Sequence, residues 1–117
     1  MSDDLATLKV EERGEVVIAS VTGELDVSVA PALGDEIAAA LPTSARALVV
    51  DFSALEFIDS SGIAMLFSLA RRLAGRRQQL SVVAPGGEPV ARVLELVDFG
   101  RAAPMHADVE SAVTELG

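Results

Sequence analysis

Short, nearly continuous aliphatic runs alternate in this sequence with longer segments in which apolar residues recur at helical spacing. The runs Val16-Val17-Ile18-Ala19 and Ala47-Leu48-Val49-Val50 contain no polar residue, which is typical of strands that are buried on both faces. Strands that alternate with helices require crossover connections, which place the helices on the faces of the sheet. The sequence therefore predicts an α/β fold with a mixed sheet of about four to five strands and roughly four helices packed on it.

The elements are expected in the order strand, strand, helix, strand, helix, strand, helix, followed by a weak strand and a last helix. Arg13-Gly14 predicts a hairpin turn, Gly23 is expected to end the second strand, and Ser28 is expected to cap the first helix. Residues 54–60 are expected to form a connection, and Gly75 is expected to close the second helix. The predicted ranges are 5–12, 15–21, 29–41, 47–50, 61–74, 80–84, 90–99, 102–105 and 109–116.

The composition limits how this fold can be stabilised and which chemistry it can carry. The 117 residues have the usual size of one domain, here 1–117, and four Phe with no Tyr or Trp leave a mainly aliphatic core. The absence of cysteine excludes disulfides, thiolate metal sites and a cysteine nucleophile. Because the chain has only one histidine in addition, we expect neither a zinc site nor another metal or cofactor.

The charge balance favours protein partners over nucleic acid or a membrane. The chain carries 18 acidic residues against nine basic ones, a formal charge of −9, which repels polyanions and anionic lipid surfaces. Arg71, Arg72, Arg76 and Arg77 form a basic cluster, but a helix is expected to end there, and cations complement its dipole. The first residues lack a signal-peptide pattern, and no apolar run approaches the roughly 18 residues of a membrane span. We therefore expect a cytoplasmic protein.

Two polar segments follow strands, at the place where sites gather in open α/β sheets. One is Gly23-Glu24-Leu25-Asp26, and the other runs from Glu56 to Gly62. Asp59 or Ser60 is expected to cap the helix that follows, and this structural role is sufficient to explain either residue on its own. The functional alternative is a serine at an exposed helix start that accepts a phosphoryl group, whose charge the helix N-terminus stabilises.

Three segments, each joining a strand to the following helix, resemble the STAS domain family, and within it the bacterial anti-sigma factor antagonists. The resemblance covers nearly the whole chain. The segments are Gly23-Glu24-Leu25-Asp26 with Ala30-Pro31, Leu48 to Ser53 leading to Phe57-Ile58-Asp59-Ser60-Ser61-Gly62-Ile63, and Leu80 to Ala84 followed by Val93-Leu94-Glu95-Leu96.

The resemblance implies a binding module, not an enzyme, that binds an anti-sigma factor and so releases the sigma factor. It implies that this partner is a serine kinase with a histidine-kinase-like ATP fold. The kinase would phosphorylate the serine directly after the aspartate, here Ser60, and so end the binding, and a metal-dependent serine phosphatase would restore it. The resemblance also implies a partner-facing surface at Gly23, Glu24, Leu25, Asp26, Asp59, Ser61, Gly62 and Ile63.

Other readings of the same residues are weaker. A receiver domain would use Asp51 as its phosphoacceptor, but it also needs a lysine near a fifth strand, and the only lysine is Lys9. A hydrolase built from Asp59, Ser60 and His106 lacks the Gly-x-Ser-x-Gly elbow, and His106 is expected near a surface turn. Within the STAS fold, a scaffold or a soluble subunit of a lipid-transport or stressosome complex remains the alternative. Such a protein would bind partners without a phospho-switch.

Overall fold

The structure is a computed structural model that describes residues 6–116, and over this range strands and helices alternate as predicted. The strands are β1 (Ala6–Arg13), β2 (Val16–Leu25), β3 (Ala47–Asp51), β4 (Leu55–Ile58), β5 (Gln79–Val83) and β6 (Met105–His106). The helices are α1 (Ala30–Ala40), α2 (Ser60–Gly75), α3 (Pro89–Leu96) and α4 (Val109–Leu116), with a 3₁₀ helix, η1, at Phe99–Arg101. The mixed α/β class is confirmed, with six strands in the described range instead of four to five.

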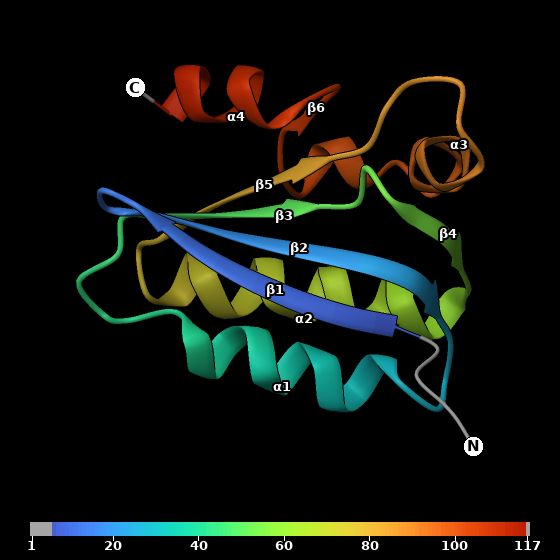
Figure 1. Cartoon of the computed structure of the whole chain (residues 1–117), viewed down its shortest axis with the longest axis horizontal. Coiled ribbons are helices and arrows are strands. Elements are labelled where there is room, and N and C mark those ends of the chain that lie inside the picture. The colour runs from blue at the N-terminus through green and yellow to red at the C-terminus, as the bar shows by residue number, and fades with distance from the viewer. Residues whose placement is uncertain (1–5, 117) are drawn as a thin grey trace.

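The sheet is parallel except at its first pair of strands. Its order is β1-β2-β3-β5-β6, and only β1 pairs antiparallel, with β2. β2 is longer than its parallel neighbour: residues 16–20 pair with β3, and residues 23–25 pair with β4. β4 therefore takes over from β3 alongside the last part of β2, at the right-hand end of the sheet in Figure 1.

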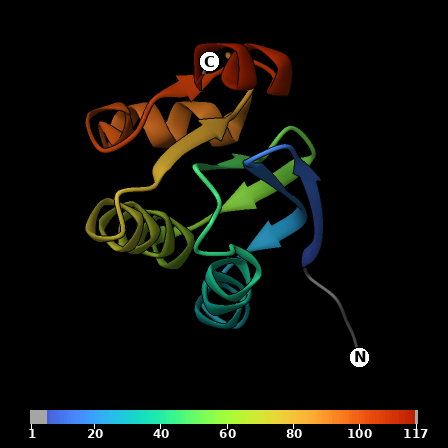
Figure 2. The same cartoon turned by 90° about the vertical axis from the view of Figure 1, so that its left-hand side faces the viewer.

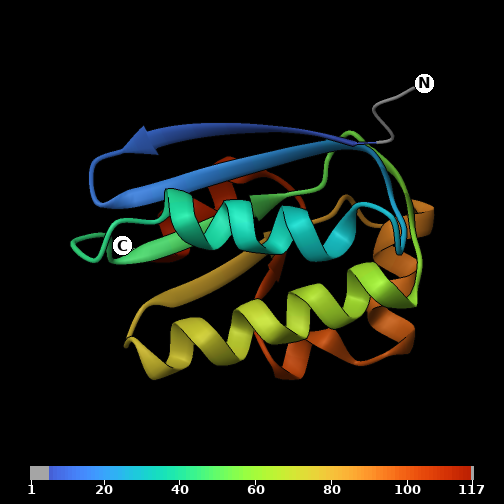
Figure 3. The ribbon, with the colours of Figure 1, turned by 90° about the horizontal axis from the view of Figure 1, so that it is seen from below.

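The aliphatic runs are buried on both faces of the sheet, as predicted. Every residue of 16–19 and of 47–50 is at most 4% exposed. Because side chains alternate along a strand, Val17 and Val50 pack in the main core with α1 and α2, whereas Val16 and Val49 pack under α4. Figure 2 shows these helices on opposite sides of the sheet, and Figure 3 shows α1 and α2 side by side, both beginning at the end where β2 finishes.

Two predictions around the second strand are wrong. Gly23 does not end β2, which continues to Leu25 through an irregularity between Gly23 and Glu24. Gly23 has φ +94° there, a backbone conformation that glycine adopts without steric cost. Residues 54–60 are not an irregular connection, because Leu55–Ile58 form β4 along this extension of β2.

Smaller differences concern the ends of elements. The hairpin turn lies at residues 14–15, one residue later than expected, and Leu5 lies outside the described residues. Ser28 does not cap α1, because its N–H and hydroxyl both donate to Oδ1 of Asp26, and Val29 precedes the helix. Gly75 is the last residue of α2, but the left-handed conformation that follows the helix falls on Arg77, at φ +59°. The weak strand predicted at 102–105 is β6, at 105–106.

Candidate functional site

β2 and β4 bring the two polar segments together at one end of the sheet. Leu25 lies opposite Ile58 in the parallel pairing of the two strands. The backbone N–H of Asp59 then donates to the carbonyl oxygen of Leu25 at 3.1 Å. The expectation that both segments meet at one edge is confirmed, and the ladder between β2 and β4 fixes where α2 begins (Figure 1).

Asp59 is the residue that caps α2. It has extended backbone angles, φ −108° and ψ −170°, and its Oδ1 accepts from the N–H groups of Ser61 at 2.8 Å and Gly62 at 3.2 Å. These donors have no partner within the first turn of a helix, so the carboxylate satisfies groups that would otherwise need water. The side chain of Ser60, which is the first residue of α2, is therefore not used as the cap.

The two serines of the motif differ in exposure. Ser60 is exposed, whereas Ser61 is half-buried on the side of α2 that faces α1. The hydroxyl of Ser60 is therefore the more accessible of the two to another protein. The asymmetry follows from the helix itself, because consecutive residues of a helix point in different directions.

Two residues predicted to face a partner are instead part of the packing beneath the site. Leu25 is 0% exposed, so its side chain belongs to the core. Gly62 is buried as well, and a Cβ atom there would lie 3.1 Å from Cβ of Leu25. Both residues position the exposed part of the motif, but neither offers a side chain to a partner.

The remaining predicted residues lie at or near the surface. Glu24 is exposed, while Gly23, Asp26, Asp59 and Ile63 are half-buried. Asp26 also organises the turn into α1, because its carbonyl oxygen accepts from the N–H groups of the two residues at the start of that helix, Val29 and Ala30. Its carboxylate is therefore held at the same end of the sheet as Asp59.

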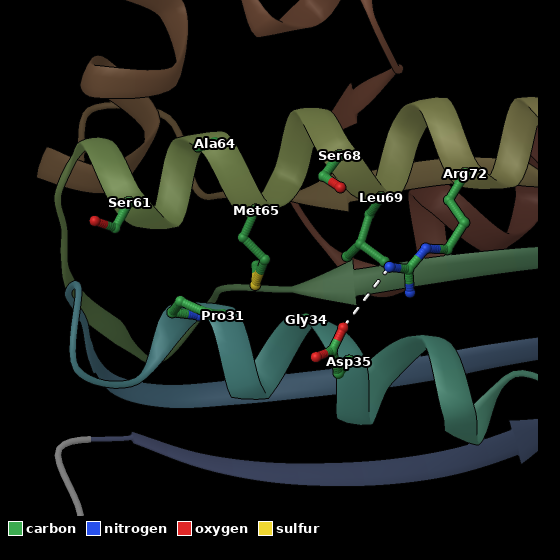
Figure 4. A pocket seen from close by; sticks show the side chains of 9 residues that line it. All are labelled: Pro31, Gly34, Asp35, Ser61, Ala64, Met65, Ser68, Leu69 and Arg72. Atoms are coloured by element: carbon green, nitrogen blue, oxygen red, sulfur yellow. Dashed lines mark ion pairs between the residues drawn. The ribbon is translucent and has the colours of Figure 1, made fainter.

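A groove between α1 and α2 opens beside this site. It has a volume of about 410 Å³ and is lined by Pro31, Gly34, Asp35, Ser61, Ala64, Met65, Ser68, Leu69 and Arg72. Figure 4 shows Ser61 at one end of the groove and the ion pair between Arg72 and Asp35, at 3.7 Å, near the other. The sequence does not reveal this groove, because its walls come from two helices that are separated in the sequence.

The sequence also does not single out two exposed apolar residues at the same end of the sheet as Ser60. Phe57 in β4 is 47% exposed, and Val27 in the turn after β2 is 69% exposed. The only signal available in the sequence is that Val27 directly follows Asp26 in a polar segment. Phe57 stands between Leu55 and Ile58, both buried, so the sequence gives no sign that it is exposed.

The geometry gives no support to hydrolase or metal chemistry. His106 is the half-buried last residue of β6, next to the exposed bend at residues 107–108, and within residues 6–116 no hydrogen bond links it to Asp59 or Ser60. The described part of the chain also holds no group of three or more His, Cys, Asp or Glu that could bind a metal ion. None of the helices in that part is long and apolar enough to span a membrane.

Fold and site together define a small α/β binding domain that presents an exposed serine at a helix start. The chain belongs to the STAS domain family: the family model described as "Mlab, STAS domain" matches residues 8–109. It is 29% identical over 111 residues to the anti-sigma-F factor antagonist RsfB of Mycobacterium tuberculosis, an alignment that covers 95% of this chain and 89% of RsfB.

Solved structures agree with this assignment. An anti-sigma factor antagonist from Mycobacterium paratuberculosis superposes with a TM-score of 0.84 and 34% identity, covering 94% of this chain and 92% of that one. The Bacillus cell fate determinant SpoIIAA in its phosphorylated form superposes with a TM-score of 0.68 and 24% identity, covering 95% of this chain and 100% of that one. At this identity, the second likeness supports the fold alone.

Proposed function

We propose that this protein is an anti-sigma factor antagonist that binds an anti-sigma factor kinase and is switched off by phosphorylation of Ser60. The observation that carries the proposal is that Ser60 is exposed at the start of α2 while Asp59 performs the capping. The hydroxyl of Ser60 is thus free of a structural role. The names of the RsfB and M. paratuberculosis relatives support the antagonist part of this proposal.

The position of Ser60 suits a charge switch. A phosphate would add about −1.5 to −2 charges to a helix start, where the helix dipole and backbone N–H groups favour an anion. The same phosphate would be on the residue next to Asp59, so burying it against a partner would mean desolvating a concentrated negative charge. Such a penalty reaches a few kcal/mol, and about 1.4 kcal/mol already weakens binding tenfold.

The proposal assigns different roles to the residues around Ser60. Glu24, Asp26, Asp59, Ser61 and Ile63 would offer side chains to the anti-sigma factor, whereas Gly23 and Gly62 would contribute backbone shape. A metal-dependent serine phosphatase would remove the phosphate and restore binding. All of these steps would take place in the cytoplasm, where sigma factors act.

The experiment that tests the proposal is phosphorylation in vitro. The protein is incubated with ATP and each candidate anti-sigma kinase from its own genome, and the intact mass is then measured. One added phosphate is expected on the wild type and on Ser61→Ala, and none on Ser60→Ala. An adduct that persists in Ser60→Ala would place the modification elsewhere.

A pull-down from cells addresses the alternative role within the family. If no kinase modifies the protein and the pull-down recovers transporter ATPase components instead of an anti-sigma factor, the chain is a scaffold subunit. If the pull-down recovers an anti-sigma factor only with unmodified protein, the proposed switch is supported.

A further inference from the structure

Phe57 is more exposed than the other three phenylalanines of the chain. Phe52 and Phe99 are 1% and 0% exposed, and Phe67 packs edge-to-face on Phe99 with ring centroids 5.0 Å apart. Phe57, in contrast, is 47% exposed. Burying an aromatic ring is strongly favourable, and where an exposed ring lies with other exposed apolar residues, the group of them indicates a contact with another molecule.

The packing of β4 does not explain why an aromatic residue stands at position 57. The strand is anchored by the side chains of Leu55 and Ile58, which are 7% and 5% exposed. Phe57 lies opposite Glu24 in the pairing with β2, and Glu24 is itself exposed. A polar residue at position 57 would therefore leave the two anchoring residues of β4 in place.

A second exposed apolar residue lies at the same end of the sheet. Val27 is 69% exposed in the turn between β2 and α1. This turn follows Leu25, the residue that pairs with Ile58 and accepts the hydrogen bond from Asp59. Val27 thus follows the end of β2, and Phe57 lies in β4, the neighbouring strand that leads into Asp59 and Ser60.

The charges around these apolar residues are almost all of one sign. The sequence contains no Lys or Arg between Arg13 and Arg46, or between Arg46 and Arg71. The ionisable side chains on the last part of β2, on β4 and in the segments that follow them are Glu24, Asp26, Glu56 and Asp59. The neighbouring helix α3 packs against β4 and adds Glu95 and one base, Arg92.

We infer that Phe57 and Val27 are the apolar anchors of the surface that binds the anti-sigma factor, which presents to them an apolar hollow bordered by Lys or Arg. The inference rests on the proposed function and adds which residues hold the partner. Exposed aromatic residues at the centre of an interface commonly carry most of its affinity. Complementary charges around them mainly speed association and select the partner.

The first test measures affinity for a purified anti-sigma factor that binds the wild-type protein. Phe57→Ala and Val27→Ser are each expected to weaken binding tenfold or more. Val10→Ala is the matched control, because Val10 is 41% exposed on β1, away from the site, and it is expected to bind as the wild type does. Circular dichroism of all three variants establishes that the fold is kept, and the high exposure of Val27 makes that variant informative even if Phe57→Ala is destabilised.

The second test concerns charge. Glu56→Lys is expected to slow association at low salt, and the difference from wild type is expected to shrink as salt is added. Glu12→Lys is the control, since Glu12 is exposed near the hairpin turn at the opposite end of β2. Equal association rates for the two variants would overturn the inferred basic rim.

The outcomes separate this inference from the proposed function. If no anti-sigma factor binds the wild type, the proposed function fails. If one binds the wild type, Phe57→Ala and Val27→Ser equally well, the function stands and the inferred anchors are wrong. If Phe57→Ala changes only the sedimentation of the isolated protein, the surface joins two copies of this chain, which also overturns the inference.

Discussion

Gly62 lies so close to Ile58 that a Cβ atom on the glycine would be 2.6 Å from Cγ1 of the isoleucine. Gly62 is in the first turn of α2, and Ile58 is the last residue of β4. The helix can therefore begin directly against the end of the strand only because residue 62 has no side chain. This close approach is what places the exposed Ser60 at the end of the sheet.

Gly62→Ala is expected to destabilise the protein by about 1–3 kcal/mol, the usual cost of overpacking a filled core. The methyl group would collide with Ile58 and Leu25, which are 5% and 0% exposed. Gly75→Ala is the control, because Gly75 is also in α2 but has nothing within 4 Å of its Cβ position. Alanine there gains up to about 1 kcal/mol of helix propensity. Urea unfolding measures both, and equal midpoints would contradict the role of Gly62.

The strands that the sequence predicts well are those with strong local patterns. Val16 to Ala19 and Ala47 to Val50 are aliphatic without interruption, and their burial follows from that alone. β4 has only four residues, of which Leu55 and Ile58 are buried, and it is ordered because β2 extends past Gly23 to pair with it. That pairing is non-local, so neither segment shows it by itself.

The sequence predicts where the candidate site lies, but not which residue caps α2 or which side chains of the site are buried. The two motifs indicate which segments meet, yet the sequence leaves open whether Asp59 or Ser60 caps α2. It also cannot show that Leu25 points into the core, because that depends on the irregularity after Gly23. The exposure of Phe57 has the same origin in the pairing of β4 with β2.

Asp59→Ala is expected to cost about 0.5–2 kcal/mol of stability, the usual effect of losing an N-cap side chain. The loss arises because the N–H groups of Ser61 and Gly62 would have no carboxylate oxygen to accept their hydrogen bonds. Asp59→Asn should retain most of the stability, since asparagine is an equally good cap. Urea unfolding of the two variants makes the comparison, and equal losses would show that the carboxylate acts by charge and not as a cap.

Asp108 should make the stability of the protein depend on acid pH. Its Oδ1 accepts a hydrogen bond from the N–H of Ser111, in the first turn of α4, at 2.7 Å. This bond, with a smaller contribution from the charge of His106, holds the pKa of the Asp108 carboxyl below its ordinary value of 3.8. Because the folded-state pKa is lowered, the stabilisation is fully present above the ordinary value and is lost as the pH falls through the lowered one.

The measurement compares wild type with Asp108→Asn, which keeps a capping oxygen but cannot ionise. The difference in unfolding free energy between them is expected to shrink as the pH falls below about 5. A difference that stays constant down to pH 2, or that grows as acid is added, would contradict the assignment.

Adding charge at Ser60 should weaken binding to the anti-sigma factor, whereas removing the hydroxyl should not. Ser60→Asp places a carboxylate next to Asp59 at the exposed start of α2, and burying this additional charge at an interface opposes binding. Ser60→Ala leaves the capping by Asp59 intact and is expected to bind as the unmodified protein does. Ser44→Asp is the control, because it adds the same charge to an exposed serine between α1 and β3, at the other end of the molecule. Calorimetric titration compares the three, and if Ser60→Asp binds as tightly as Ser44→Asp, charge at residue 60 is not the switch.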